Sequence, residues 1–266
     1  MTTREGDGEV LLVERRDAVA VLTLNRPQVR NARNAALRRA LVEACAELDP
    51  EPGIRAVVLT GAGDKAFCSG LDLTELAGDR NNKGPRDKIV GAFNDIQAVS
   101  AMRTPTIAAI NGVAAGGGLE LALACDLHIA STTARFGLLE GKRGNIPGNG
   151  GTQRLPRLTS TAFALEMLLT ADLVDARLAL ANGLVEHVHQ PDDLMPAALA
   201  MATKIAANAP LAVQAAKRAV YDGSRMSLRD GLALEEELSI QLRATDDWRE
   251  GLQAFAEKRP PVWRSR

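Results

Sequence analysis

Aromatic residues and cysteines are scarce in this chain of 266 residues. Only 3% of the residues are aromatic, and only three are cysteines, Cys45, Cys68 and Cys125. The cysteines are odd in number and far apart, so they form neither a disulfide framework nor a zinc-type pair. We expect reduced thiols in a cytoplasmic protein. With few aromatic side chains and 23 glycines, the core should consist of Ala, Leu and Val with close approaches of the backbone.

The chain also lacks a strong charge and a targeting segment. Its formal net charge of −1 gives no basic footprint, which argues against nucleic acid as the main partner. The first ten residues contain no apolar run and no cleavage signal, which argues against secretion. The most apolar region, 106–125, is interrupted by Asn111, by three successive glycines and by Glu120. We interpret it as a strand, a turn and a buried helix rather than a membrane span.

Two common kinds of site have no counterpart in the sequence. No Gly-x-Ser-x-Gly elbow is present, which disfavours a serine hydrolase. His187 and His189 alternate without a third ligand, which argues against a metal site. His128 lies in an apolar strand-like run and is expected to be a core histidine, and the acidic run 235–237 is expected to be a solvated helix face.

Hydrophobic patterns instead predict strands and helices that alternate along the chain, which favours an α/β architecture with parallel strands. We expect strands at 10–14, 19–24, 55–60 and 106–110. Loops are expected at 15–17, at 61–70 and, as an exposed excursion, at 76–88. Helices are expected after the N-cap Asn34, at 87–102, from the glycine run at 116–118, and at 194–208, 210–221, 227–243 and 246–257. The change to a helical pattern divides the chain into a core domain, 1–195, and a helical region, 196–266.

Two glutamates, Glu120 and Glu140, lie in glycine-rich segments and are candidates for catalysis. Burying an unpaired carboxylate is unfavourable, so Glu120, among Leu and Ala residues, is either paired with an arginine or functional. Glu140 has Lys142 and Arg143 nearby, so a surface ion pair is the alternative for this residue. Two positioned carboxylates can act as a general base and a general acid on one substrate.

Backbone N–H groups near these glutamates could bind a developing negative charge. If Gly116, Gly117 and Gly118 start a helix, their N–H groups are unpaired and can hold an oxyanion. The segment AFCSGLD, 66–72, is a second place where N–H groups are exposed. Taken alone, each segment is better explained by close packing or by an ordinary loop.

Together, these segments resemble the enoyl-CoA hydratase/isomerase, or crotonase, superfamily. The resemblance covers nearly the whole chain and runs through LNRPQVRNA, FCSGLDL, AINGVAAGGGLELALACDLHIA, FGLLEGKRGNIPGNGGTQRLPR, LTADLVDARLALANGLVEHV, PLAVQAAKRAV and EGLQAFAEKRPP. It implies an α/β fold made of a spiral of ββα units. It also implies a helical C-terminal region that assembles trimers or dimers of trimers.

The resemblance further implies a lyase that hydrates 2-enoyl-CoA thioesters, as in the β-oxidation of fatty acids. The N–H groups of Leu71 and Gly117 would form an oxyanion hole for the thioester carbonyl. Glu120 would help to activate the water that adds to the β-carbon, and Glu140 would give a proton to the α-carbon. No metal or redox cofactor is implied, because coenzyme A is part of the substrate.

The family's coenzyme A contacts map onto two segments near the glutamates and one residue near the C-terminus. By resemblance, they are Val29, Arg30, Asn31, Ala32, Ala66, Phe67, Gly70, Gly116 and Lys258. Lys258 would reach the nucleotide across a subunit interface. Arg30 is equally well explained as a phosphate ligand and as a solvated loop arginine.

Three positions depart from the pattern and concern the acyl group. Leu71 replaces a small residue, and Asn145 and Asn149 replace aliphatic or small ones. The asparagines suggest a branched or oxygenated acyl group. Alternatives to hydration are double-bond isomerisation, acyl-CoA or C–C hydrolysis, and a non-catalytic acyl-CoA-binding scaffold. An isomerase needs only a carboxylate near Glu140, so the presence of Glu120 favours hydration.

Overall fold

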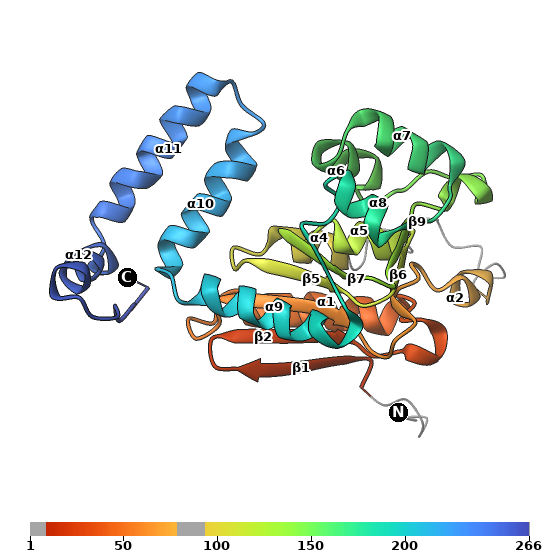
Figure 1. Cartoon of the computed structure of the whole chain (residues 1–266), viewed down its shortest axis with the longest axis horizontal. Helices are drawn as coiled ribbons and strands as arrows, with labels where there is room; N and C mark the ends of the chain where they lie inside the picture. The colour runs from red at the N-terminus through yellow and green to blue at the C-terminus, as the bar shows by residue number, and fades with distance from the viewer. Residues whose placement is uncertain (1–8, 79–93, 266) are drawn as a thin grey trace.

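The larger of two β-sheets forms the centre of the molecule (Figure 1). The computed structural model describes residues 9–78 and 94–265 of the chain. The large sheet has the strand order β1-β2-β3-β5-β7-β10. Its strands are β1 (Leu11–Arg16), β2 (Val19–Leu24), β3 (Ala56–Gly61), β5 (Thr106–Ile110), β7 (Leu127–Ser131) and β10 (His187–His189). Only β1 is antiparallel to its neighbour, as expected for strands joined by long crossovers.

A second, smaller sheet has the order β4-β6-β8-β9. Its strands are β4 (Ala66–Cys68), β6 (Val113–Ala115), β8 (Arg135–Gly137) and β9 (Val174–Asp175). Each of β3, β5 and β7 in the large sheet is followed in the chain by β4, β6 or β8 in the small one. One pair of strands thus adds one step to both sheets, which is the predicted spiral of ββα units.

Helices cover the sheets and continue beyond them. In the first half of the chain they are η1 (Pro27–Val29), α1 (Ala35–Leu48), α2 (Leu73–Gly78), α4 (Asp95–Ala101) and α5 (Gly117–Ala122). The second half contains η3 (Glu140–Arg143), α6 (Gly151–Leu158), α7 (Thr161–Thr170), α8 (Ala176–Ala181), α9 (Pro191–Ala206), α10 (Pro210–Gly223), α11 (Leu228–Arg243) and α12 (Asp246–Glu257). Among the described residues, no helix combines the length and the apolar character needed to cross a membrane.

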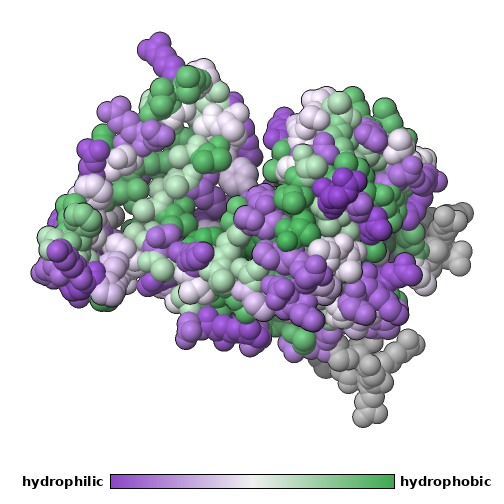
Figure 2. Space-filling model, viewed as in Figure 1, coloured by the Kyte–Doolittle hydropathy of each residue, from purple (hydrophilic) through white to green (hydrophobic). Residues whose placement is uncertain are grey.

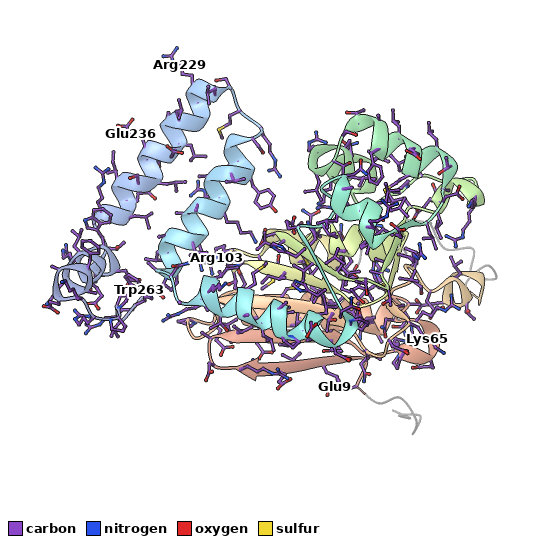
Figure 3. The ribbon with its side chains drawn as sticks, viewed as in Figure 1. Glu9, Lys65, Arg103, Arg229, Glu236 and Trp263 are labelled. Carbon is purple, nitrogen blue, oxygen red and sulfur yellow. The ribbon has the colours of Figure 1, made fainter. Side chains whose placement is uncertain are left out.

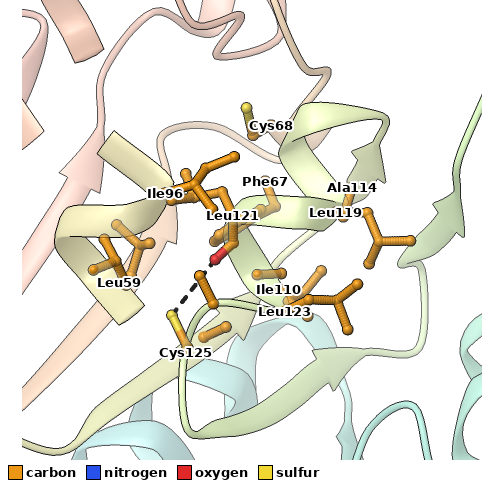
Figure 4. Close-up of a cluster of buried hydrophobic side chains, with 14 of the residues drawn as sticks. Leu59, Phe67, Cys68, Ile96, Ile110, Ala114, Leu119, Leu121, Leu123 and Cys125 are labelled. Atoms are coloured by element: carbon orange, nitrogen blue, oxygen red, sulfur yellow. Dashed lines mark hydrogen bonds between the residues drawn. The ribbon is translucent and has the colours of Figure 1, made fainter. Parts of the chain in front are cut away.

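The core has two layers, one on each face of the large sheet. Small and branched side chains of β2, β3, β5 and β7 pack against α9 on one face. On the other face, larger side chains from α1, α4 and α5 meet the sheet, as the close-up in Figure 4 shows around Leu59, Phe67, Ile96 and Leu119. Phe67 is fully buried here, so its side chain serves the core.

Two expectations about local structure are wrong. The strand expected to stop before residue 15 continues to Arg16, because Arg16 pairs with Val19 across a two-residue turn in which Asp17 has φ 52°. Residues 66–68 of the expected loop form β4, because they pair with β6. Within the described residues, the helix expected at 87–102 is α4, which begins at Asp95, since the Asn94 side chain accepts a hydrogen bond from the N–H of Gln97 and caps it. Residues 79–93, including most of the expected excursion at 76–88, lie outside the described part of the chain.

The last three helices carry many exposed apolar side chains. Figure 1 shows that α10 and α11 form a hairpin that leads away from the sheets, with α12 at the open end of the hairpin, opposite its tip. Figure 2 shows apolar surface along this hairpin, where it borders a hollow between the hairpin and the rest of the molecule. Leu228 is 80% exposed and Phe255 is 87% exposed. The predicted division at residue 195 falls within α9, and the division into domains stays a prediction.

Candidate active site

Two backbone N–H groups that the sequence singled out lie close together at the start of α5. Arg33 donates its N–H to the carbonyl of Gly70 and accepts the N–H of Asp72, at 2.8 and 3.1 Å, which pairs Arg33 with Leu71 as a parallel bridge. In such a bridge the N–H of the middle residue, Leu71, points away from the pairing. The N–H of Gly117, the first residue of α5, has no partner within its helix.

A Cβ built on Gly117 would lie 3.8 Å from the nitrogen of Leu71, so both groups border the same small space. Close packing is needed to bring them together. A Cβ on Gly70, which has φ 100°, would lie 3.2 Å from the Gly117 nitrogen, and a Cβ on Gly118 would overlap the Cys68 carbonyl. The glycine run therefore serves close packing and, through it, the convergence of the N–H groups.

Glu120 is buried, with 1% of its surface exposed, and its carboxylate accepts hydrogen bonds from a loop. Its Oε1 accepts the N–H of Asn149 at 2.7 Å and that of Gly151 at 2.9 Å, and its Oε2 lies 3.4 Å from the Asn149 amide nitrogen. Arg154 holds the same loop by donating to the Asn149 carbonyl at 2.8 Å. The expected alternative, an ion pair with an arginine, is wrong, because no such pair with Glu120 occurs among the described residues.

Glu140 is half-buried at the start of η3, and its carboxylate lies against α5. A Cβ on Gly116 would lie 2.7 Å from its Oε1. Its Oε2 is buried and has no hydrogen-bond partner in the part of the chain that the structure describes. Burial raises the pKa of Glu140, and the nearby charge of Glu120 raises this pKa further. Lys142 pairs with Asp172 at 2.8 Å, so the expected surface ion pair with Lys142 does not form.

The first of the segments expected to bind coenzyme A borders a small basic pocket. The pocket has a volume of about 210 Å³ and is lined by Pro27, Arg30, Ala62, Gly63, Asp64, Lys65 and Ala66. Of the expected contacts, Val29 is 40% exposed, whereas Ala32, Ala66 and Phe67 are buried. These three can offer a ligand little more than their backbone.

The side chain of Asn31 has a structural role in the loop that is expected to contact coenzyme A. It is fully buried, and its amide nitrogen donates to the carbonyls of Ala62 and Ala66 at 3.0 and 2.8 Å. Its Oδ1 accepts the N–H of Arg26 at 3.0 Å. The side chain therefore fixes the loop that carries Arg30 beside Ala66.

Lys258 lies far from this pocket within one chain. It is exposed at the C-terminal end of α12. Figure 3 labels Lys65 at one end of the molecule and Trp263, which follows α12, at the other. A role for Lys258 at the pocket thus requires a second copy of the chain.

The structure also reveals an ion pair that the sequence patterns did not indicate. Arg33 and Asp95 are 3% and 1% exposed and pair next to Gly117. They are 62 positions apart, and neither belongs to a recognisable motif. The one signal in the sequence that could have drawn attention to Arg33 is its location directly before the helix cap Asn34.

Cysteines and histidines contribute nothing to the site. All three cysteines are free and buried, and burial raises the pKa of Cys45 to about 12 and that of Cys68 to about 11. His128 is buried, as expected, and its Nδ1 lies 3.4 Å from Oε1 of Glu186. Among the described residues, no group of three or more His, Cys, Asp or Glu could hold a metal ion.

Comparisons with known proteins identify relatives along nearly the whole chain. The family model for enoyl-CoA hydratase/isomerase matches residues 14–266. The chain is 44% identical to the (E)-benzylidenesuccinyl-CoA hydratase of Thauera aromatica over 92% of this chain and 95% of that protein. It is 39% identical to the short-chain-enoyl-CoA hydratase of Clostridium acetobutylicum, over 94% and 95% of the two chains.

A solved structure shows the same fold along nearly the whole chain. The crystal structure of an enoyl-CoA hydratase from Bacillus anthracis superposes with a TM-score of 0.91 and 39% identity, covering 97% of this chain and 100% of that one. The match of fold and sequence confirms both the predicted α/β spiral and the resemblance drawn from the motifs. The chain belongs to the enoyl-CoA hydratase/isomerase family.

Proposed function

We propose that the protein is a hydro-lyase that adds water across the double bond of a 2-enoyl-CoA thioester. The observation that carries the proposal is the pair of glutamates beside two free N–H groups. Glu120 is held by three N–H donors, whereas Glu140 has a raised pKa and an unpaired carboxylate oxygen. The names of relatives at about 40% identity support the same activity.

In the proposed reaction, the carbonyl oxygen of the thioester accepts hydrogen bonds from the N–H groups of Leu71 and Gly117. These donors stabilise the enolate-like charge that develops on this oxygen, and loss of one such donor typically reduces kcat about 10² to 10³-fold. Glu120 accepts a proton from water as the water oxygen bonds to the β-carbon. Glu140, whose raised pKa favours the protonated form, gives its proton to the α-carbon.

Only proton transfers are needed in this sequence of steps. The water supplies the hydroxyl group of the product, and the proton it leaves on Glu120 balances the proton lost by Glu140. We therefore propose that the reaction uses no metal or redox cofactor, and a chelator such as EDTA should leave the rate unchanged.

The coenzyme A part of the substrate is proposed to lie along the loop of Arg30. Arg30 and Lys65 line the same pocket and supply two positive charges for phosphate groups. The backbone of Ala66 and the glycine pair Gly70 and Gly116 then lead from this pocket to the oxyanion hole. Val29 borders the entrance with 40% of its surface exposed.

The acyl group is proposed to lie beside Leu71 and the loop that carries Asn145 and Asn149. Asn145 is exposed, and the Asn149 amide faces Glu120. Both side chains tolerate a branched acyl group, and they offer hydrogen bonds to the oxygen atoms of an oxygenated one. A rate profile that prefers plain linear enoyl groups would contradict this part of the proposal.

The C-terminal helices are proposed to pack against further copies of the chain, giving trimers or dimers of trimers. Exposed apolar side chains on this region support the proposal: they include Val220, Met226, Leu228, Leu232, Ile240, Leu252 and Phe255. Lys258 would then reach the nucleotide bound to a neighbouring subunit. Light scattering coupled to gel filtration measures the mass, and a monomer would contradict the proposal.

The physiological setting follows from the same reasoning. We propose a cytoplasmic enzyme of acyl-CoA metabolism, with fatty-acid β-oxidation as the pathway that such a hydration serves. Free, buried cysteines fit a reducing compartment. Localisation of a tagged chain and growth of a deletion strain on fatty acids test these two statements.

The first test is hydration itself, followed as loss of the ultraviolet absorbance of the conjugated thioester across short to long 2-enoyl-CoAs. The wild type should turn over these substrates. The variants Glu120→Gln and Glu140→Gln should each bind coenzyme A thioesters but show no turnover. If the folded, ligand-binding wild type consumes no 2-enoyl-CoA, the proposal is wrong. Isomerisation of 3-enoyl-CoAs that survives Glu120→Gln would identify an isomerase instead.

A further inference from the structure

A fully buried ion pair lies directly beneath the proposed oxyanion hole. The guanidinium of Arg33 donates to both carboxylate oxygens of Asp95, from Nε at 2.7 Å and from Nη2 at 2.9 Å. Its remaining nitrogen, Nη1, donates to the carbonyl of Gly117 at 2.6 Å. Proton transfer in hydration uses neither residue.

Arg33 contacts both segments that supply the N–H donors. Its backbone brackets Leu71, because it bonds to Gly70 on one side and to Asp72 on the other. Its side chain holds Gly117. One residue therefore adds hydrogen bonds to both segments, which otherwise meet through the close packing of Gly70 and Gly118.

Asp95 determines how the guanidinium of Arg33 is oriented. Its two-point contact with Nε and Nη2 leaves Nη1 as the group that faces α5. Asp95 is the first residue of α4 and also lies 3.6 Å from Nε of Arg38 on α1. The pair thus connects α1, α4 and α5 at one point.

Stability alone does not account for such a pair. Replacing a buried ion pair with apolar side chains of similar volume is often neutral or stabilising. A planar fork with a fixed third donor instead provides geometric accuracy, because the direction of each N–H is determined by the other two contacts. The group that this contact holds in place is Gly117, whose own N–H is one of the two proposed oxyanion donors.

We propose that Arg33 is a positioning residue that fixes the spacing between the N–H groups of Leu71 and Gly117, and that Asp95 orients it. The role in hydration rests on the proposed function. An oxyanion donor acts only when it lies about 2.7–3.1 Å from the oxygen it stabilises. A misplacement of about 1 Å can reduce the rate roughly 10²-fold.

Two variants separate positioning from simple support of the fold. Arg33→Lys keeps the charge, but a single ammonium group cannot make the two-point contact with Asp95 and reach Gly117 as well. The double variant Arg33→Met with Asp95→Leu removes both charges and fills the space with apolar atoms. Lys217→Met is the matched control. It breaks a different ion pair, the partly buried pair of Lys217 with Asp126 at 2.7 Å, and this pair contacts neither Leu71 nor Gly117.

Both Arg33 variants should show kcat lower by about tenfold to a hundredfold, with KM within about threefold of the wild type. Lys217→Met should keep the wild-type kcat. A double variant with wild-type stability and wild-type kcat would overturn the proposal, because Arg33 would then only support the fold. If the double variant does not fold, Arg33→Lys decides alone, and wild-type kcat in that variant would also overturn it.

A spectroscopic measurement makes the test independent of turnover. Butanoyl-CoA has no double bond to hydrate, and its thioester carbonyl, labelled with carbon-13, reports polarisation by the two N–H groups as a lowered infrared stretching frequency. The frequency should be lowered on binding to the wild type and to Lys217→Met, and less so in both Arg33 variants. Equal shifts in all four proteins would overturn the inference even if the wild type hydrates no enoyl-CoA, whereas failure of hydration with the expected shifts would overturn only the proposed function.

Discussion

Replacement of Gly116 by alanine should separate catalysis from stability at this site. Gly116 has φ 53° and ψ −128°, a conformation that side chains other than glycine rarely adopt and that destabilises an alanine by about 1–3 kcal/mol. The new Cβ would also lie 2.7 Å from Oε1 of Glu140, whereas ordinary contact begins at 3.4 Å. Glu140 must therefore move by about 0.7 Å, the difference between these two distances.

The displacement falls on a flexible side chain, so it should reduce activity more than it reduces stability. A shift of this size approaches the misplacement of about 1 Å that can lower a rate roughly 10²-fold. We expect Gly116→Ala to fold and to hydrate 2-enoyl-CoA with kcat about 30 to 100 times lower than the wild type. Initial rates of absorbance loss give kcat, and urea unfolding gives the free energy of unfolding.

Gly183→Ala is the control for backbone strain. Gly183 has φ 72°, and a Cβ there would lie 3.7 Å from its nearest neighbour, the carbonyl of Leu158, which is an ordinary contact. This variant should lose about 1–2 kcal/mol of stability and keep the wild-type kcat. Similar kcat values in Gly116→Ala and Gly183→Ala, within about threefold, would refute the placement of the Glu140 carboxylate against α5.

Three further predictions concern the glutamates and the basic pocket. Because the folded state raises the pKa of Glu140 above its ordinary 4.5, the wild type should lose stability as the pH rises from 4.5 through the folded-state pKa. Glu140→Gln lacks this loss. Urea unfolding across pH should therefore show that the free energy of unfolding of the variant, relative to that of the wild type, increases over this pH window and is constant below it. Asn149→Ala keeps the backbone bond to Glu120 at 2.7 Å and loses only the long one at 3.4 Å, so kcat should fall less than about tenfold; a larger loss would show that the amide itself takes part. Arg30→Ala combined with Lys65→Ala should raise KM roughly tenfold for coenzyme A thioesters and leave N-acetylcysteamine thioesters unaffected, and equal effects on both would place the phosphates elsewhere.

Part of the large sheet was predictable because β2, β3 and β5 are short continuous apolar runs. The expected strands at 19–24 and 106–110 coincide with β2 and β5, and the expected helix at 246–257 coincides with α12. The strands of the small sheet were not predictable in the same way. β4 has three residues, too few to show a period, and only its pairing with β6 distinguishes it from a loop.

The candidate site was predictable where side chains carry the chemistry and not where the backbone does. Glu120 and Glu140 stood out because a carboxylate is unusual among glycines and aliphatic residues. The donors that hold Glu120 are mainly the N–H groups of Asn149 and Gly151, and an N–H group leaves no mark in the sequence. Arg33 was missed for a different reason: its partner Asp95 is distant in sequence, and only the folded chain brings the two charges together.

The spiral distributes the proposed site over successive steps of one staircase. Leu71 follows β4, Gly117 and Glu120 follow β6, and Glu140 follows β8, so each strand of the small sheet from β4 to β8 leads into at least one group of the proposed site. The loop at 144–150, beside which the acyl group is proposed to lie, is outside these strands. Because the same loop holds Glu120 through the N–H of Asn149, a change in its length or sequence alters the proposed acyl pocket and the placement of this carboxylate together, whereas Leu71 and Gly117 are held by Arg33 and are independent of the loop.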